Sequence, residues 1–174
     1  ETDFGQVDII VNNAGITSSA PFAEFDIELF DRIIKTNFFG VVNCCHAFLP
    51  KLLPRGDGHI VNMSSMLGFV GVPNQSAYVS TKFAIRGFTE SLWAELDGTG
   101  IAVTGIYPGT IQSDILQRAS FSDAREKAAM MKMMDRFGIP ASDVAKKTVN
   151  AIRHGRREVV IGRDAIALVA LKRF

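Results

Sequence analysis

Short runs of β-branched and other apolar residues alternate along this chain with longer segments of helical periodicity. We predict strands at residues 7–11, 59–63, 101–107 and 158–161, and helices at 26–53, 75–96 and 142–152. This alternation is typical of an α/β layer fold with a parallel sheet. The run VDIIV at 7–11 is too apolar for a strand with one solvated face, so it should be covered on both sides.

Composition narrows the class of protein. A chain of 174 residues with 47% hydrophobic residues can bury the core of one domain. The formal net charge of +1 gives no reason to expect nucleic acid as a partner. No apolar run approaches the roughly 20 residues of a transmembrane helix. The first residues, Glu1-Thr2-Asp3, have neither the basic region nor the apolar stretch of a secretory signal, so we expect none. The adjacent Cys44 and Cys45 suit neither a disulfide framework nor a zinc site. We therefore expect a cytoplasmic protein without a metal.

Tyr78 and Lys82 stand four residues apart on a predicted helix and should share one face. Proton transfer near pH 7 requires a tyrosine pKa about three units below its ordinary value. A cation about 4 Å away contributes about 4 kcal/mol at an effective dielectric of about 20, which is sufficient. The pair therefore suits acid/base chemistry, although the spacing by itself favours an exposed amphipathic pair.

Polar or glycine-containing segments follow three of the predicted strands. They are Asn12 to Gly15 after the first, Ser64 and Ser65 after the second, and Pro108 and Gly109 after the third. Ligands bind beyond the carboxyl ends of strands in open α/β sheets, so these segments mark a candidate site. Each would also suit a plain turn, and for Ser64 we favour the turn.

Asn37 falls on the apolar stripe of the first predicted helix, between Ile34 and Val41. A buried amide without partners would be costly. Either Asn37 binds water and backbone at a functional site, or the helix face turns and exposes it. The pattern leaves both open.

In this order, these residues resemble the short-chain dehydrogenase/reductase (SDR) family. Asn12-Asn13-Ala14-Gly15 matches its NNAG element, and Asn37 its helix asparagine. Ser65 lies thirteen residues before Tyr78, as the family's serine does, and Tyr78 to Lys82 matches YxxxK. Pro108-Gly109 matches the motif after the next strand. The similarity extends from Val7 to about Gly162.

The resemblance implies a Rossmann-like, doubly wound parallel sheet in a three-layer α/β/α arrangement. It implies that Tyr78 is the general acid/base, that Ser65 holds the substrate oxygen, and that Lys82 lowers the tyrosine pKa and contacts the nicotinamide ribose. Asn37 would anchor a water for proton relay. The cofactor, NAD or NADP, would be contacted by the following residues: Asn13, Ala14, Gly15, Tyr78, Lys82, Pro108, Gly109, Ile111 and Ser113. Ser113 stands near where the family often has threonine.

The family's glycine-rich TGxxxGxG turn has no counterpart in these 174 residues. We therefore expect the chain to be the C-terminal, catalytic part of a single SDR domain (1–174), starting at about the fourth strand of seven. An irregular, methionine-rich stretch at about 113–138 should form a flexible substrate lid, which suggests a lipophilic ketone or alcohol. The resemblance also implies a homodimer or homotetramer.

Two other functions remain open at this stage. One is the reduction of 3-oxoacyl thioesters. The other is a truncated, non-catalytic relative that serves as a binding or scaffold module.

Overall fold

A parallel four-stranded sheet lies at the centre of the structure, a computed structural model that describes residues 5–172. The strands run in the order β1 (Ile9–Asn12), β3 (Gly58–Met63), β4 (Ile101–Pro108) and β8 (Glu158–Ile161). Every pairing is parallel. The predicted parallel α/β sheet is confirmed, and each strand lies within two residues of its predicted position.

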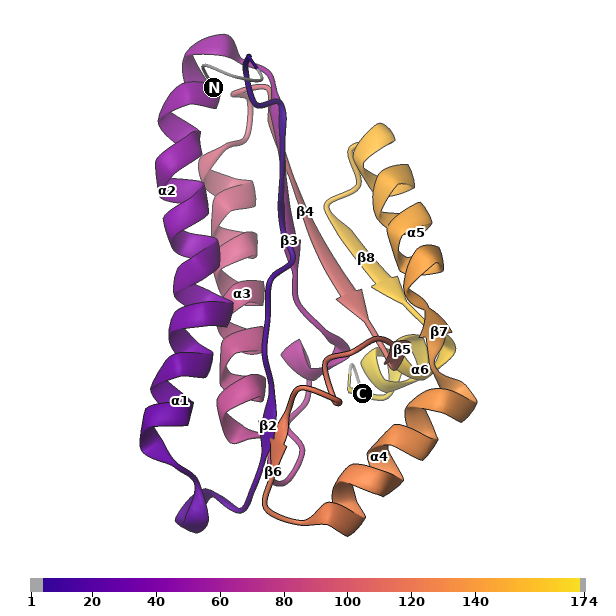
Figure 1. The fold of residues 1–174 in the computed structure, drawn as a ribbon. Coiled ribbons are helices and arrows are strands. Elements are labelled where there is room, and N and C mark those ends of the chain that lie inside the picture. The colour runs from indigo at the N-terminus through magenta and orange to yellow at the C-terminus, as the bar shows by residue number, and fades with distance from the viewer. Residues whose placement is uncertain (1–4, 173–174) are drawn as a thin grey trace.

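The remaining elements connect these strands or flank the sheet (Figure 1). The helices are α1 (Ile27–Ile34), α2 (Gly40–Leu52), α3 (Ser76–Glu95), α4 (Ala124–Phe137), α5 (Ala141–Arg153) and α6 (Arg163–Lys172). Two small parallel pairs join β2 (Ser18–Ser19) to β6 (Ser120–Phe121) and β5 (Ile111–Gln112) to β7 (Ile139–Pro140).

Helices cover both faces of the sheet, as alternation of apolar residues along the strands requires. On one face Ile60 and Val103 pack with Cys45 of α2 and Ile85 of α3. On the other face a second cluster joins strand residues to α5; it contains Val61, Ile106, Ile161, Val144 and Ala151. In Figure 1, α1 to α3 lie on one side of the sheet and α5 on the other, which confirms the three layers.

The predicted helix 26–53 is continuous but changes its winding midway. The Asp26 side chain caps it by accepting from the backbone N–H of Glu28 at 2.9 Å. Between α1 and α2, Lys35–Phe39 form a π-helical turn. Such single wide turns frequently mark functional sites, and this one carries Asn37.

The stretch 113–138, predicted to be irregular, instead contains the regular helix α4. Asp123 caps it by accepting from the N–H of Arg125 at 2.7 Å. The helix is rich in alanine, methionine, lysine and arginine, which favour helix. The prediction of an irregular chain was therefore wrong for Ala124–Phe137.

Part of the sheet face next to α5 is open at β1. Ile9 and Val11 are each 49% exposed there, and β1 pairs with β3 alone among residues 5–172. Within the same residues, no helix has the length and apolar character needed to cross a bilayer. Cys44 and Cys45 are free thiols.

Candidate active site

Two cavities meet at the carboxyl edge of the sheet. The larger, of about 780 Å³, lies beyond the ends of β1, β3 and β4 and extends to α5. The smaller, of about 350 Å³, lies between this edge and α4. Ser65 and Tyr78 line both cavities, as do Gly109, Ile111 and Ile115, so molecules bound in the two cavities would meet at these residues.

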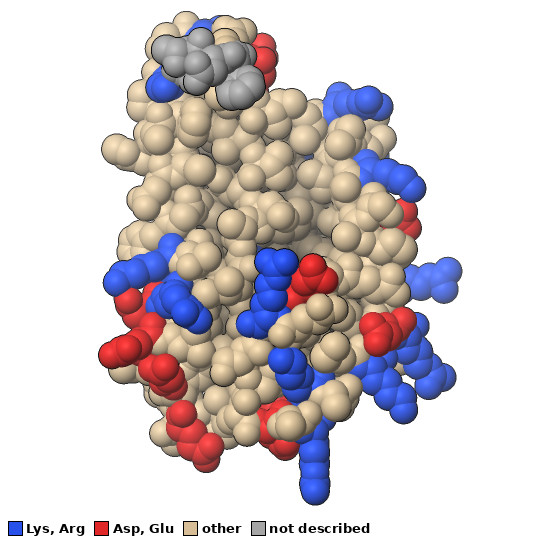
Figure 2. Space-filling model, in the orientation of Figure 1, with Lys and Arg blue, Asp and Glu red and all other residues tan. Residues whose placement is uncertain are grey.

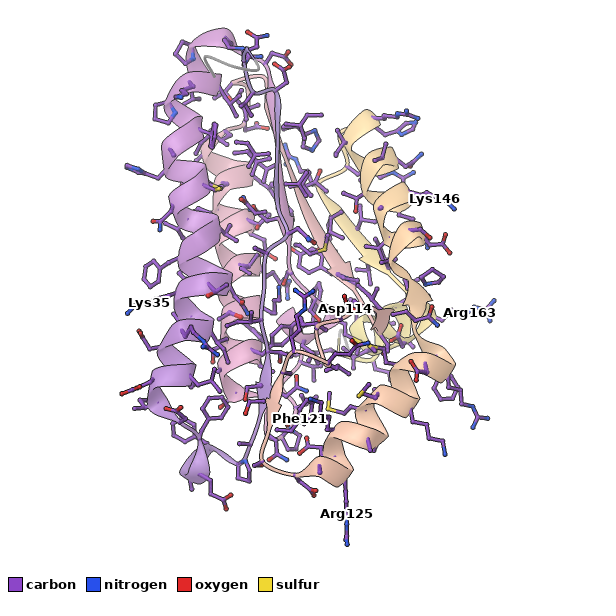
Figure 3. The ribbon with its side chains drawn as sticks, in the orientation of Figure 1. Lys35, Asp114, Phe121, Arg125, Lys146 and Arg163 are labelled. Carbon is purple, nitrogen blue, oxygen red and sulfur yellow. The ribbon has the colours of Figure 1, made fainter. Side chains whose placement is uncertain are left out.

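The larger cavity collects most of the residues that the resemblance assigns to a cofactor. Its walls include Asn13, Gly15, Lys82, Pro108, Gly109, Ile111 and Ser113, whereas Ala14 is not part of the lining. Asp114, labelled in Figure 3, also borders it. In Figure 2 most of the surface around the central hollow is uncharged, but a basic and an acidic side chain lie next to each other at its rim.

Lys82 is buried, which excludes the exposed amphipathic pair left open by its spacing. The residue is 4% exposed, and Nζ donates to the carbonyl oxygen of Met63 at 2.9 Å. Nζ lies 5.3 Å from the centre of the Tyr78 ring. Burial lowers the pKa of Lys82 to about 8, because the charged amine loses its hydration.

Tyr78 keeps its proton at neutral pH in this structure. Burial raises the pKa of Tyr78 to about 12, and a hydrogen bond with the Ser65 side chain opposes that rise. Burial is the larger of these two influences, and the lowering of this pKa by Lys82 stays a prediction. The phenol holds the proton that a general acid would donate, and donation near pH 7 would require its pKa to fall toward that value.

Asn37 is fully buried and fully bonded. Its Oδ1 accepts from the N–H of Ile16 at 2.8 Å, and its Nδ2 donates to the Ile16 carbonyl at 2.9 Å and to Thr81 Oγ1 at 3.2 Å. The alternative of an exposed asparagine is wrong. The amide joins the π-helical turn to the segment after β1 and to α3.

Gly15 lies beside this amide and the Lys82 side chain. A Cβ built at Gly15 would lie 3.5 Å from Asn37 Oδ1 and 3.9 Å from Lys82 Nζ. Asn37, Lys82 and the end of β1 are therefore in one contiguous cluster, although they are separated by many residues in the sequence.

The two serines after β3 have different surroundings. Ser64 is buried and donates its hydroxyl to the carbonyl of Lys82 at 2.8 Å, so it fixes the backbone of α3. Ser65 Oγ accepts from the N–H of Leu67 at 3.1 Å and lines both cavities. The turn contact favoured for Ser64 is therefore wrong, because its partner lies 18 residues away in α3, and Ser65 is the serine of the two that lines the cavities.

Asp164, at the start of α6, holds the segment after β4 and was not singled out from the sequence. Its Oδ2 accepts from the N–H of Thr110 at 2.7 Å. A Cβ at Gly109 would lie 2.2 Å from Asp164 Oδ1, so this close packing requires glycine. The contact spans 54 residues, and no local pattern reveals it.

With this geometry described, comparison with known proteins identifies the family. The family model described as short chain dehydrogenase matches residues 1–124. The chain is 39% identical over 174 residues to SadH of Mycobacterium tuberculosis, which is named as an oxidoreductase. It is also 35% identical over 162 residues to the 3-oxoacyl-[acyl-carrier-protein] reductase FabG of Staphylococcus aureus. The chain belongs to the short-chain dehydrogenase/reductase family.

A solved structure supports the fold independently. A short-chain dehydrogenase/reductase from Burkholderia phymatum, crystallised with NAD, superposes with a TM-score of 0.88 at 24% identity and covers 97% of this chain and 66% of its own. The match to SadH includes 98% of this chain and 63% of SadH. The match to FabG includes 93% of this chain and 65% of FabG. It therefore corresponds to less than two thirds of the length of these relatives.

Proposed function

We propose that the protein is an NAD(P)-dependent oxidoreductase that interconverts a lipophilic ketone or aldehyde with the corresponding alcohol. One observation carries this proposal: Ser65 and Tyr78 lie where the two cavities meet, and Lys82 lies behind Tyr78. A two-substrate reaction requires such a junction, because the cofactor and the substrate must meet at the proton donor.

The larger cavity suits the nicotinamide and ribose end of the cofactor. Gly15 and Gly109 give it walls without side chains, and Lys82 supplies a donor from its floor. Asn13, Ile111 and Ser113 would complete the contacts. When bound, the nicotinamide supplies or accepts the hydride.

In the reducing direction, Tyr78 would donate its phenolic proton to the substrate oxygen. Ser65 would hold that oxygen in place through its hydroxyl group. Lys82 would stabilise the developing phenolate by its positive charge and contact the ribose hydroxyls. Asn37 would hold the loop after β1 against α3 and anchor the water of a proton relay.

The smaller cavity supports a lipophilic substrate. It is lined by Met66, Met130, Met133 and Met134 together with Leu67, Val72, Ile115 and Leu116. Thioether side chains are flexible and adapt to varied apolar shapes. We propose that the segment 113–138, which carries α4, acts as the substrate lid.

A 3-oxoacyl thioester is the second candidate substrate, and the 35% identity to FabG favours it. Comparing a simple methyl ketone with a 3-oxoacyl thioester of matched chain length would separate the two substrate candidates.

We further propose that the protein forms a homodimer or homotetramer, to be checked by sedimentation equilibrium. The cytoplasmic location stays a prediction.

The test is cofactor binding and turnover by the full-length protein. We expect NADH or NADPH fluorescence to change on binding, and an apolar ketone to be reduced. If neither cofactor bound, the enzyme proposal would fail and the non-catalytic binding module would take its place.

A further inference from the structure

The smaller cavity contains one charged side chain within the described residues 5–172, and it is Glu126. The other lining residues are apolar or neutral. Glu126 lies in the first turn of α4, so its carboxylate enters the cavity from α4 and not from the sheet.

Both carboxylate oxygens of Glu126 are bound by neutral donors. Oε1 accepts from the Ser19 hydroxyl at 2.6 Å, and Oε2 accepts from Nδ2 of Asn74 at 3.2 Å. Ser19 belongs to β2, and Asn74 has a left-handed backbone with φ of 63° just before α3. One side chain therefore ties α4 to two separate parts of the molecule.

The pairing of β2 with β6 holds the carboxylate in this place. Ser18 Oγ donates to the Ser120 carbonyl at 3.0 Å, and the N–H of Ser122 donates to the Ser19 carbonyl at 3.0 Å. In Figure 3, Phe121 lies in this region, and the Arg125 side chain points away from the molecule.

The neighbouring Lys127 bonds to the carbonyls of Gln117 and Ala119. In the described part of the chain, no lysine or arginine forms an ion pair with Glu126.

The negative charge of Glu126 is therefore not neutralised by a cation, and it lies in an apolar cavity. An anion bound there would be repelled by this like charge and would lose part of its hydration to the apolar lining. A neutral molecule of the same shape would suffer neither penalty.

We propose that Glu126 is a specificity-determining residue that restricts the smaller cavity to substrates without a negative charge. The inference rests on the proposed function, because it describes the substrate site of that reaction. It adds the class of substrate: neutral apolar ketones and alcohols are accepted, and carboxylate-bearing analogues of the same length are rejected.

The test compares a medium-chain keto ester with the keto acid formed by its hydrolysis. For the full-length enzyme we expect the kcat/KM of the ester to exceed that of the acid by roughly a hundredfold. In E126Q we expect this ratio of ester to acid to fall by at least about tenfold. The change should come from better use of the acid. Glutamine retains the length of the side chain and can still accept from Ser19.

E95Q is the matched control. Glu95 also accepts from a serine hydroxyl, Ser91 Oγ at 2.9 Å, but it lies at the exposed end of α3 and lines neither cavity. We expect E95Q to leave the ratio of ester to acid unchanged. Equal rates for acid and ester in the unmodified enzyme, or an unchanged ratio in E126Q, would overturn the proposal.

A binding measurement separates this inference from the proposed catalysis. With 13C-methyl methionine labels, the ester should shift the NMR signals of Met66, Met130, Met133 and Met134, and leave Met131, which lines neither cavity, unchanged. The acid should shift them only in E126Q. If these shifts occur without turnover, the proposed reaction fails and the specificity role stands; if neither compound shifts them, the specificity role fails.

Discussion

The two sides of the candidate site are built differently. We call the sheet edge and α3 its floor, and α4 its cover. On the floor, Ser64, Thr81 and Lys82 are buried and bonded to backbone carbonyls, so their positions are fixed by the sheet and α3. In the cover, Met134 is the single buried residue of α4, and Met133 is 46% exposed. We infer that proton transfer depends on the rigid floor, and that the choice of substrate depends on the loosely packed cover. Substitutions in the two regions should therefore change different quantities.

The largest effect is expected for Tyr78→Phe on the floor. Removing the phenolic hydroxyl removes the proposed proton donor, and kcat should fall by about a thousandfold, within the range for general acid catalysis. The cofactor Kd should change less than about threefold, because the ring remains. Steady-state kinetics and fluorescence titration measure the two quantities. Turnover near the normal rate would remove Tyr78 from its role.

The two serines after β3 provide a matched pair. Ser65→Ala should lower kcat by roughly a hundredfold with little loss of stability, because Ser65 faces the cavities. Ser64→Ala should instead lower the free energy of unfolding by about 1–2 kcal/mol, because the Lys82 carbonyl loses its buried partner. Kinetics and urea unfolding compare them. The reverse pattern would contradict the distinction between the two side chains.

The charge of Lys82 predicts how the floor responds to pH. Its pKa of about 8 means that the positive charge is lost as the pH rises through this value. Ketone reduction should then decline by roughly tenfold per pH unit above about 8. A reduction rate that stayed flat from pH 7 to about 10 would show that this charge is not used.

The lowered pKa of Lys82 should affect stability in the opposite direction to activity as the pH rises. The folded pKa of Lys82 is below its ordinary value of 10.5, so the folded state favours the neutral amine. The contribution to the free energy of unfolding should therefore rise as the pH increases from about 8 to 10.5. In Lys82→Met this pH-dependent rise should be missing from thermal unfolding curves. An equal rise in the variant would assign it to other groups.

The smallest effects on stability are expected in the cover. Met133→Ala should change the free energy of unfolding by less than about 0.5 kcal/mol, as for an exposed position, and raise the KM of an apolar ketone by a few-fold. Met134→Ala, at a buried position, should cost about 2 kcal/mol or more. Urea unfolding and substrate kinetics test both variants. A loss of kcat as large as that of Tyr78→Phe would contradict the division between floor and cover.

The features that were predictable from the sequence depend on local patterns. The strand at 158–161 has its predicted bounds because β-branched residues between turn residues define it. Tyr78 and Lys82 share a helix face because of their spacing. Helix α4 also has a local signal, Asp123 followed by good helix formers, which the many methionines concealed.

The features that were not predictable depend on partners distant in the sequence. The surroundings of Asn37 depend on Ile16 and Thr81, at separations of 21 and 44 residues. Glu126 reaches Ser19 across 107 residues. The pKa of Tyr78 depends on its burial in the assembled fold and on its hydrogen bond with Ser65. Such contacts follow from the assembled fold and are not encoded by any short motif.

Transfer of isotope is the most direct test of the central claim, that a cofactor and an apolar ketone meet at Tyr78. The full-length protein would be incubated with a neutral keto ester and NADH or NADPH deuterated at the nicotinamide C4, and the alcohol analysed by mass spectrometry. We predict one deuterium on the carbinol carbon, and the same label at a greatly reduced rate with Tyr78→Phe. Alcohol without deuterium, or equal labelling rates in the two proteins, would contradict the account.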